Sequence, residues 1–296
     1  MAGSIRARAM SETRRAALWG AALLRLRANR PACLALAVLL GVALLALFAP
    51  LASPWAYDSL DWHHLAQPPT LGASHWFGTD RLGRDLFVRT LHGVRLSLLI
   101  SVLASVLSVG IGLAWGAVAG FAGGRLDEWM MRFVDVLYAL PYLFLVIVLS
   151  TLVGRGSIAV LLLGVAAVGW LTTARIVRGQ TLQLKRREFI EAARATGLPT
   201  RAILLRHIVP NLAGTVAVYA TLTVPQMILF ESFLSFLGLG VQEPHASLGN
   251  LINAGAQEME SAPWMLLVPA LFLVLLLVCL NLLGDGLRDA LDPRES

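Results

Sequence analysis

Six apolar runs, each close to the length that crosses a lipid bilayer, constrain this chain more than any other feature. They fall at residues 32–53, 96–119, 130–153, 157–177, 211–237 and 263–284. A helix needs about 20 apolar residues to span a bilayer. Only 14% of the residues are charged and 57% are hydrophobic. In soluble domains, roughly a quarter of the residues are charged. The pattern therefore predicts an all-α membrane protein with six transmembrane helices.

The distribution of basic residues predicts the orientation of these helices. Seven arginines precede residue 31, eight basic residues lie in 175–206, and the segment 238–262 has no Lys or Arg. Basic residues concentrate on the cytoplasmic side of membrane proteins. We therefore expect both termini and the 178–207 loop in the cytoplasm, with 54–94 and 238–262 outside. The net charge of +6 is interpreted as this orientation signal. We therefore expect the protein to contact membrane lipid and not nucleic acid.

Three prolines fall inside the predicted spans, at Pro141, Pro225 and Pro269. Proline removes a backbone donor and kinks a helix, which membranes tolerate where neighbours satisfy the freed groups. Kinked helices suit a translocation path, so Pro141 and Pro225 are candidate gating or structural positions. Such prolines are also common in ordinary membrane helices.

Two acidic residues lie within the spans, Asp135 in the third and Glu231 in the fifth. An ionisable group inside a span is a functional candidate by default. Glu231 lies only six residues before Leu237, so we predict a structural or gating role, with a bond to neighbouring backbone or to Ser232. A transporter driven alone by an ion gradient needs an intramembrane ion site. Both acids lie near span ends, which disfavours that alternative.

The second span and the segment before it carry two local patterns. Gly112, Gly116 and Gly120 share one helix face, which indicates either a close helix–helix contact or an ordinary glycine-rich membrane helix. Upstream, apolar residues alternate with polar ones over 86–94. That alternation predicts a short helix on the membrane surface, capped by Thr79 or Asp80.

Sequence patterns of catalysis are missing. A phosphate-binding loop needs Gly-Lys-Ser/Thr, but the single lysine, Lys185, follows Leu184. The pair His63-His64 has no Cys or acidic cluster at ligand spacing, so we read it as loop and expect no metal. Cys33 and Cys279 lie in apolar runs and are read as packing residues. We therefore expect no catalytic residue and no cofactor in this chain, and a membrane-bound enzyme is disfavoured.

A polar, basic segment at 189–210 separates the fourth and fifth spans. It contains Glu191-Ala192-Ala193, then Gly197, then Pro210. We expect a helix over 188–196, Gly197 as its left-handed cap, and a second helix over 201–207 that Thr200 caps. Arg194, Arg201 and Arg206 form a basic rim, and the alanines leave a shallow face for another protein. Taken alone, the segment also fits an amphipathic helix on lipid headgroups.

This spacing resembles the EAA loop of ABC-importer permeases, and further stretches resemble the peptide/nickel/opine branch, in particular its second permease subunit. They are HWFGTDRLGRD at 75–85, ESFLSFLGLG at 231–240 and GDGLRDALDP at 284–293. Gln242-Glu243-Pro244 and Pro263-Trp264 are closer to the oligopeptide branch than to the dipeptide or nickel branches. His207 departs from the pattern, where an aliphatic residue is frequent.

The resemblance implies a type I ABC-importer permease in the bacterial inner membrane. It implies that the chain forms half of a translocation pathway for oligopeptides, or alternatively for dipeptides, glutathione, nickel or opines. A homologous second permease, two cytoplasmic ATPases that bind ATP and Mg²⁺, and a periplasmic or lipid-anchored peptide-binding protein are the implied partners. The residues implied in coupling to the ATPases are Glu191, Ala192, Ala193, Arg194, Gly197, Arg201 and Arg206.

These expectations divide the chain into five parts. They are a cytoplasmic tail (1–31), a first transmembrane helix (32–53), a periplasmic loop with a short interfacial helix (54–94), a permease domain (95–287) with its coupling loop at 178–210, and a second cytoplasmic tail (288–296).

Overall fold

A computed structural model describes residues 20, 24–70, 75–153 and 157–291 of the chain. The arginines of the tail before residue 20 and the residues after 291 lie outside the described part. Within it, the fold is helical and contains no strand. The helices are α2 (Arg30–Ala52), α3 (Leu86–Ala122), α4 (Gly124–Ala139), α5 (Tyr142–Val153), α6 (Ile158–Leu184), α7 (Glu188–Ala195), α8 (Thr200–Ile203), the π-helical turn η1 (Leu204–Ile208), α9 (Val209–Phe236), α10 (Leu248–Gln257) and α11 (Trp264–Leu291).

The described helices include five that are long and apolar enough to cross a membrane, and α4 with α5 forms a sixth if the bent pair counts as one span. The predicted six spans are reached only when α4 and α5 count as one, since the third span is not the single helix that the run 130–153 predicted. The axes of α4 and α5 differ by 88°. Pro141 is the cause, because the residue before a proline is driven out of the helical region. Leu140 accordingly has φ −74° and ψ 135°.

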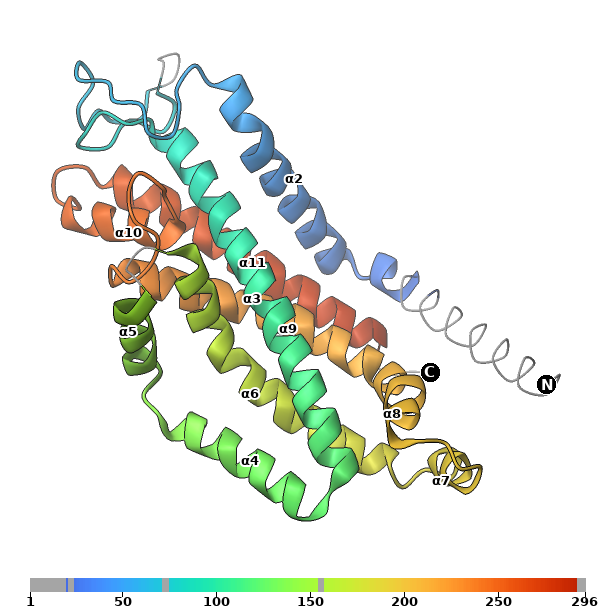
Figure 1. Cartoon of the computed structure of the whole chain (residues 1–296). Helices are drawn as coiled ribbons and strands as arrows, with labels where there is room; N and C mark the ends of the chain where they lie inside the picture. Colours follow the sequence, from blue (N-terminus) through green and yellow to red (C-terminus); the bar gives the residue numbers. More distant parts are fainter. Residues whose placement is uncertain (1–19, 21–23, 71–74, 154–156, 292–296) are drawn as a thin grey trace.

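Alternating crossings place the connections at two ends of the bundle (Figure 1). The loop between α2 and α3 lies at one end together with α10, and α7 and α8 lie at the other. Gly286 near the end of α11 lies against Ala32 at the start of α2. The start of the first span and the end of the last span therefore lie at the end of the bundle that also carries α7 and α8 (Figure 1).

The start of α3 differs from the prediction. Residues 86–94 are the first turns of a 37-residue helix and not a separate surface helix. Asp85 is the N-cap, since its carboxylate accepts a hydrogen bond from the Val88 amide at 2.8 Å. Val88, Leu91 and Val94 are buried against α2, α10 and α11. A helix buried on several sides need not alternate apolar and polar residues, so the alternation was a poor guide here.

A close contact between α3 and α6 forms the centre of the bundle. A Cβ atom on Gly112 would lie 2.8 Å from the carbonyl oxygen of Trp170, and one on Gly120 would lie 2.8 Å from that of Arg178. Gly116 lies against the backbone of Ala174. The close-contact interpretation of the three glycines is therefore correct, because the backbones approach to a distance that no side chain allows.

We expect Gly116→Ala to destabilise the protein by about 1–3 kcal/mol, since the added methyl group has to push two backbones apart. Gly110→Ala is the matched control on the same helix, because nothing lies within 4 Å of its added Cβ. Thermal unfolding in detergent measures both. Equal melting temperatures for the two variants would contradict the packing argument.

Candidate functional site

The segment between α6 and α9 folds as a helical hairpin, here called the coupling hairpin (188–208). Its first helix, α7, ends in a Schellman motif: the Gly197 amide donates to the Arg194 carbonyl at 2.9 Å, and the Leu198 amide donates to the Ala193 carbonyl at 3.2 Å. Gly197 has φ +76°, as predicted from its position. This conformation costs any residue with a Cβ, so the glycine fixes the turn of the hairpin.

The coupling hairpin is packed firmly onto the bundle. Ile190 and Ile203 are buried against Phe121 at the end of α3 and Val177 on α6. Ala193 is also buried, at 7% exposure, so the expectation that both alanines face a partner is wrong for this residue. Ala193 lies on the inner face of α7 because it is three residues after Ile190.

The outer face of the hairpin carries the remaining predicted residues. Those exposed to solvent are Glu191, Ala192, Arg194, Gly197, Arg201 and Arg206. The Arg194 guanidinium lies over the Phe121 ring, 5.0 Å from its centroid, and Leu205 is 57% exposed. The structure thus brings together a basic rim with an apolar contact point, which is a surface suited to a protein partner.

The second helix of the hairpin differs from the prediction at both ends. Pro199 and not Thr200 is the N-cap, and no side chain caps the helix. Pro210 does not separate the hairpin from the fifth span, because α8, η1 and α9 form one helical segment, the α8–α9 rod (Thr200–Phe236). The π-helical turn accommodates Pro210, which lacks an amide hydrogen and whose ring would clash with the carbonyl four residues earlier.

Glu231 lies near the far end of the α8–α9 rod and is fully buried. Its carboxylate accepts hydrogen bonds from the hydroxyl of Ser97 on α3 at 2.7 Å and from that of Ser235 at 2.8 Å. Ser232, the predicted partner, lies at 3.4 Å. Ser97 also accepts a hydrogen bond from the Leu248 amide at the start of α10. One carboxylate therefore connects α3 to the rod, and Ser97 extends that connection to α10.

The other predicted residues of the spans lie apart from the coupling hairpin. Pro225 is buried inside α9, and Pro141 lies at the bend between α4 and α5. Tyr142, next to Pro141, contacts Phe230, next to Glu231, with ring centroids 5.3 Å apart. The bend is thus in contact with the far end of the rod. Asp135, the second acid considered for an ion site, pairs with Arg175 at 2.7 Å.

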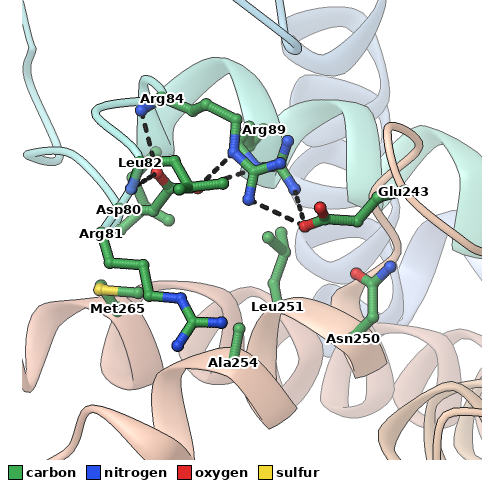
Figure 2. Close-up of a pocket in the computed structure, with 11 residues that line it drawn as sticks. Asp80, Arg81, Leu82, Arg84, Arg89, Glu243, Asn250, Leu251, Ala254 and Met265 are labelled. Carbon is green, nitrogen blue, oxygen red and sulfur yellow. Dashed lines mark hydrogen bonds and ion pairs between the residues drawn. The ribbon is translucent and has the colours of Figure 1, made fainter. Parts of the chain in front are cut away.

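Sequence reasoning assigned no role to a charged network at the end of the bundle opposite the coupling hairpin. Figure 2 shows Arg84 and Arg89 between the carboxylates of Asp80 and Glu243. Arg84 donates to Asp80 at 2.6 Å and to Glu243 at 2.9 Å. Arg89 lies 3.6 Å from Asp80 and 3.8 Å from Glu243, with a side chain only 3% exposed. A cavity of about 300 Å³ adjoins the network and extends to Leu251.

The network ties the loop before α3 to the loop after α9. Hydrogen bonding from Arg84 lowers the pKa of Glu243 against the opposing effect of burial. Burial lowers the pKa of Arg84, but the bonds to Glu243 and Asp80 outweigh it and leave the pKa raised. Both groups are therefore charged near neutral pH. The sequence offered two signals for this network. Acids and arginines alternate over 80–89, and Glu243 lies in the segment 238–262, which contains acids but no Lys or Arg.

Two protein families and a solved transporter structure resemble parts of this chain. Residues 112–296 match the family described as "Binding-protein-dependent transport system inner membrane component", and residues 17–69 match the "N-terminal TM domain of oligopeptide transport permease C". A solved structure of the inward-facing MetNI methionine ABC transporter aligns with a TM-score of 0.56 and 18% identity, over 68% of this chain and 96% of the other. That similarity shows the fold alone.

Curated relatives align over nearly the whole chain. The oligopeptide transport system permease proteins OppC of Haemophilus influenzae and Escherichia coli are each 50% identical over 278 residues, or 94% of this chain and 89% and 92% of theirs. The dipeptide transport system permease protein DppC of Bacillus subtilis is 45% identical over 91% of this chain and 84% of its own length.

Proposed function

This chain belongs to the family of binding-protein-dependent transport system inner membrane components, and on that premise we propose that it forms half of the pathway of an ATP-driven importer of oligopeptides. It is a multi-pass protein of the bacterial inner membrane and a transport subunit of a peptide ABC importer, not an enzyme. Covalent chemistry has no part in its mechanism. Its residues act by transmitting motion and by lining a path.

The observation that carries the mechanism is the continuity of the α8–α9 rod. The rod begins in the coupling hairpin and has 37 residues, which at 1.5 Å per residue is about 55 Å of helix. Its far end bears Glu231, bonded to α3. A displacement of the hairpin therefore moves the rod as one body and strains the contact of α9 with α3 at the other end. This is the motion that an alternating pathway requires.

The uncovered surfaces of the chain support the proposed partners. The basic, exposed face of the coupling hairpin is the docking surface for cytoplasmic ATPases, one for each of two permeases, and these subunits bind the ATP and Mg²⁺. Leu267, Leu271 and Val274 on α11 are each 56% exposed or more; they face lipid or a homologous second permease. The outer end receives a periplasmic or lipid-anchored peptide-binding protein.

The substrate is assigned to oligopeptides because the relatives at 50% identity carry that name. A relative named for dipeptides is 45% identical, so dipeptides are the nearest alternative, ahead of glutathione, nickel or opines. Competition of unlabelled peptides of increasing length with uptake of a labelled pentapeptide distinguishes the two. Inhibition restricted to dipeptides would contradict the assignment.

Co-purification tests the assembly. We expect the chain, tagged and extracted from its native membrane, to bring with it a homologous permease and two ATPases, and to hydrolyse no ATP when purified alone. The missing phosphate-binding loop is the reason for the second result. A homodimer that imports peptide without a second permease or an ATPase would overturn the proposal.

A further inference from the structure

Three side chains in the loop between α2 and α3 direct metal-ligating atoms at one point. They are Asp61, His64 and His75, and their ligand atoms lie within 4.8 Å of one another. His64 Nδ1 lies 2.8 Å from Asp61 Oδ2, and His75 Nε2 lies 3.5 Å from the same oxygen. Ligand atoms of a tetrahedral zinc site, each about 2.0–2.1 Å from the ion, are about 3.3 Å apart. The cluster is therefore already close to the size of such a site.

Groups outside the cluster hold its members in place. His75 is buried, and its Nδ1 lies 2.8 Å from Asp85 Oδ2, while the Trp55 ring stacks on its imidazole. Asp85 is itself fixed as the N-cap of α3. The second oxygen of Asp61 accepts the His63 amide at 3.0 Å. A carboxylate on the outer nitrogen of a ligating histidine sets its tautomer and raises its basicity in protein metal sites.

Both ring nitrogens of His75 face carboxylates, with Nδ1 2.8 Å from Asp85 and Nε2 3.5 Å from Asp61. A neutral imidazole has a single N–H, so the neutral ring can donate a hydrogen bond to only one of the two carboxylates. A metal ion between Nε2 and Asp61 would join the other pair.

We propose that Asp61, His64 and His75 bind a divalent transition-metal ion, of which Zn²⁺ fits best, with a water molecule as the fourth ligand. Imidazole ligands favour Zn²⁺ over Mg²⁺ or Ca²⁺, which prefer oxygen. The ion ties the loop to the cap of α3 through the His75–Asp85 bond, at the end of the bundle opposite the coupling hairpin (Figure 1). The sequence pair His63-His64 concealed the site, because His63 is exposed and apart from the cluster, whereas Asp61 and His75 complete it.

Zinc binding by the purified transporter tests the proposal. The complex, carried on a tag without histidine, is stripped with a chelator and titrated with Zn²⁺ against a chromophoric competitor. We expect one tight equivalent per chain in the wild type and in the control His63→Ala. His64→Ala and Asp61→Asn should each weaken binding about 100-fold or more, since each loses a ligand to the metal itself and even outer-shell changes cost about 10–100-fold.

Co²⁺ provides a second readout that needs no variant. The Co²⁺-loaded wild type should show the intense visible absorption of a tetrahedral centre, which His63→Ala keeps. Absence of this absorption, or equal zinc affinity of His64→Ala and His63→Ala, would overturn the proposal. Because Co²⁺ is read in the wild type, a failure of His64→Ala to fold does not affect this outcome.

Discussion

Gly197→Asp should lower peptide uptake at least about tenfold while the membrane domain remains folded. The glycine is exposed on the coupling hairpin, has φ +76°, and has no atom within 4 Å of an added Cβ. Aspartate is one of the few residues that adopt this conformation at modest cost, so the fold should survive. A carboxylate at the proposed ATPase surface adds an unpaired charge, and mismatched charge at an interface costs several kcal/mol. A loss of 1.4 kcal/mol already corresponds to tenfold.

Two variants separate charge from conformation. Gly197→Asn has almost the same size and tolerates the left-handed conformation, so it should keep ATPase binding and uptake. Gly197→Ala adds only the conformational cost, about 1–2 kcal/mol. Uptake in vesicles and pull-down of the ATPases are measured for all three. If Asp and Asn reduce uptake equally, charge is not the cause, and normal uptake with normal ATPase binding in Gly197→Asp would refute docking at this surface.

The sequence predicted those features of the fold that depend on local chemistry. Apolar runs of spanning length located five spans, and the glycine after α7 gave the turn of the hairpin, because φ of that residue is set by its lack of a Cβ. Pro141 was recognised as a kink, but its effect was underestimated. Whether a proline bends a membrane helix slightly or divides it in two depends on the packing of the two halves, and a sequence does not contain that information.

The charged network around Arg84 could not be predicted because its members come from distant parts of the chain. Arg84 and Glu243 are 159 residues apart, and neither has a local pattern that requires the other. The same holds for Glu231 and Ser97, separated by 134 residues. Glu231 was expected near an interface, where the burial of charge is cheap. In the structure it is fully buried, and three serine hydroxyl groups donate hydrogen bonds to its carboxylate.

Glu231→Ala should destabilise the protein by about 2–5 kcal/mol. The substitution leaves the Ser97 and Ser235 hydroxyls without their acceptor in a fully buried site and opens a cavity between α3 and α9. Thermal unfolding and the yield of assembled complex measure the loss. Glu260→Ala is the control, because Glu260 is exposed on the loop before α11 and should change neither quantity.

Glu231→Gln distinguishes a structural or gating role from substrate recognition. Glutamine keeps the shape of the side chain and one acceptor oxygen, so the cost in stability should fall to about 1 kcal/mol. Because the carboxylate oxygens are occupied by hydroxyl groups of the protein itself, we expect the order in which peptides compete for uptake to stay unchanged and only the rate to alter. A changed order of competition would show that Glu231 contacts the peptide, and an alanine variant as stable as Glu260→Ala would show that the buried carboxylate does not hold α3 against the rod.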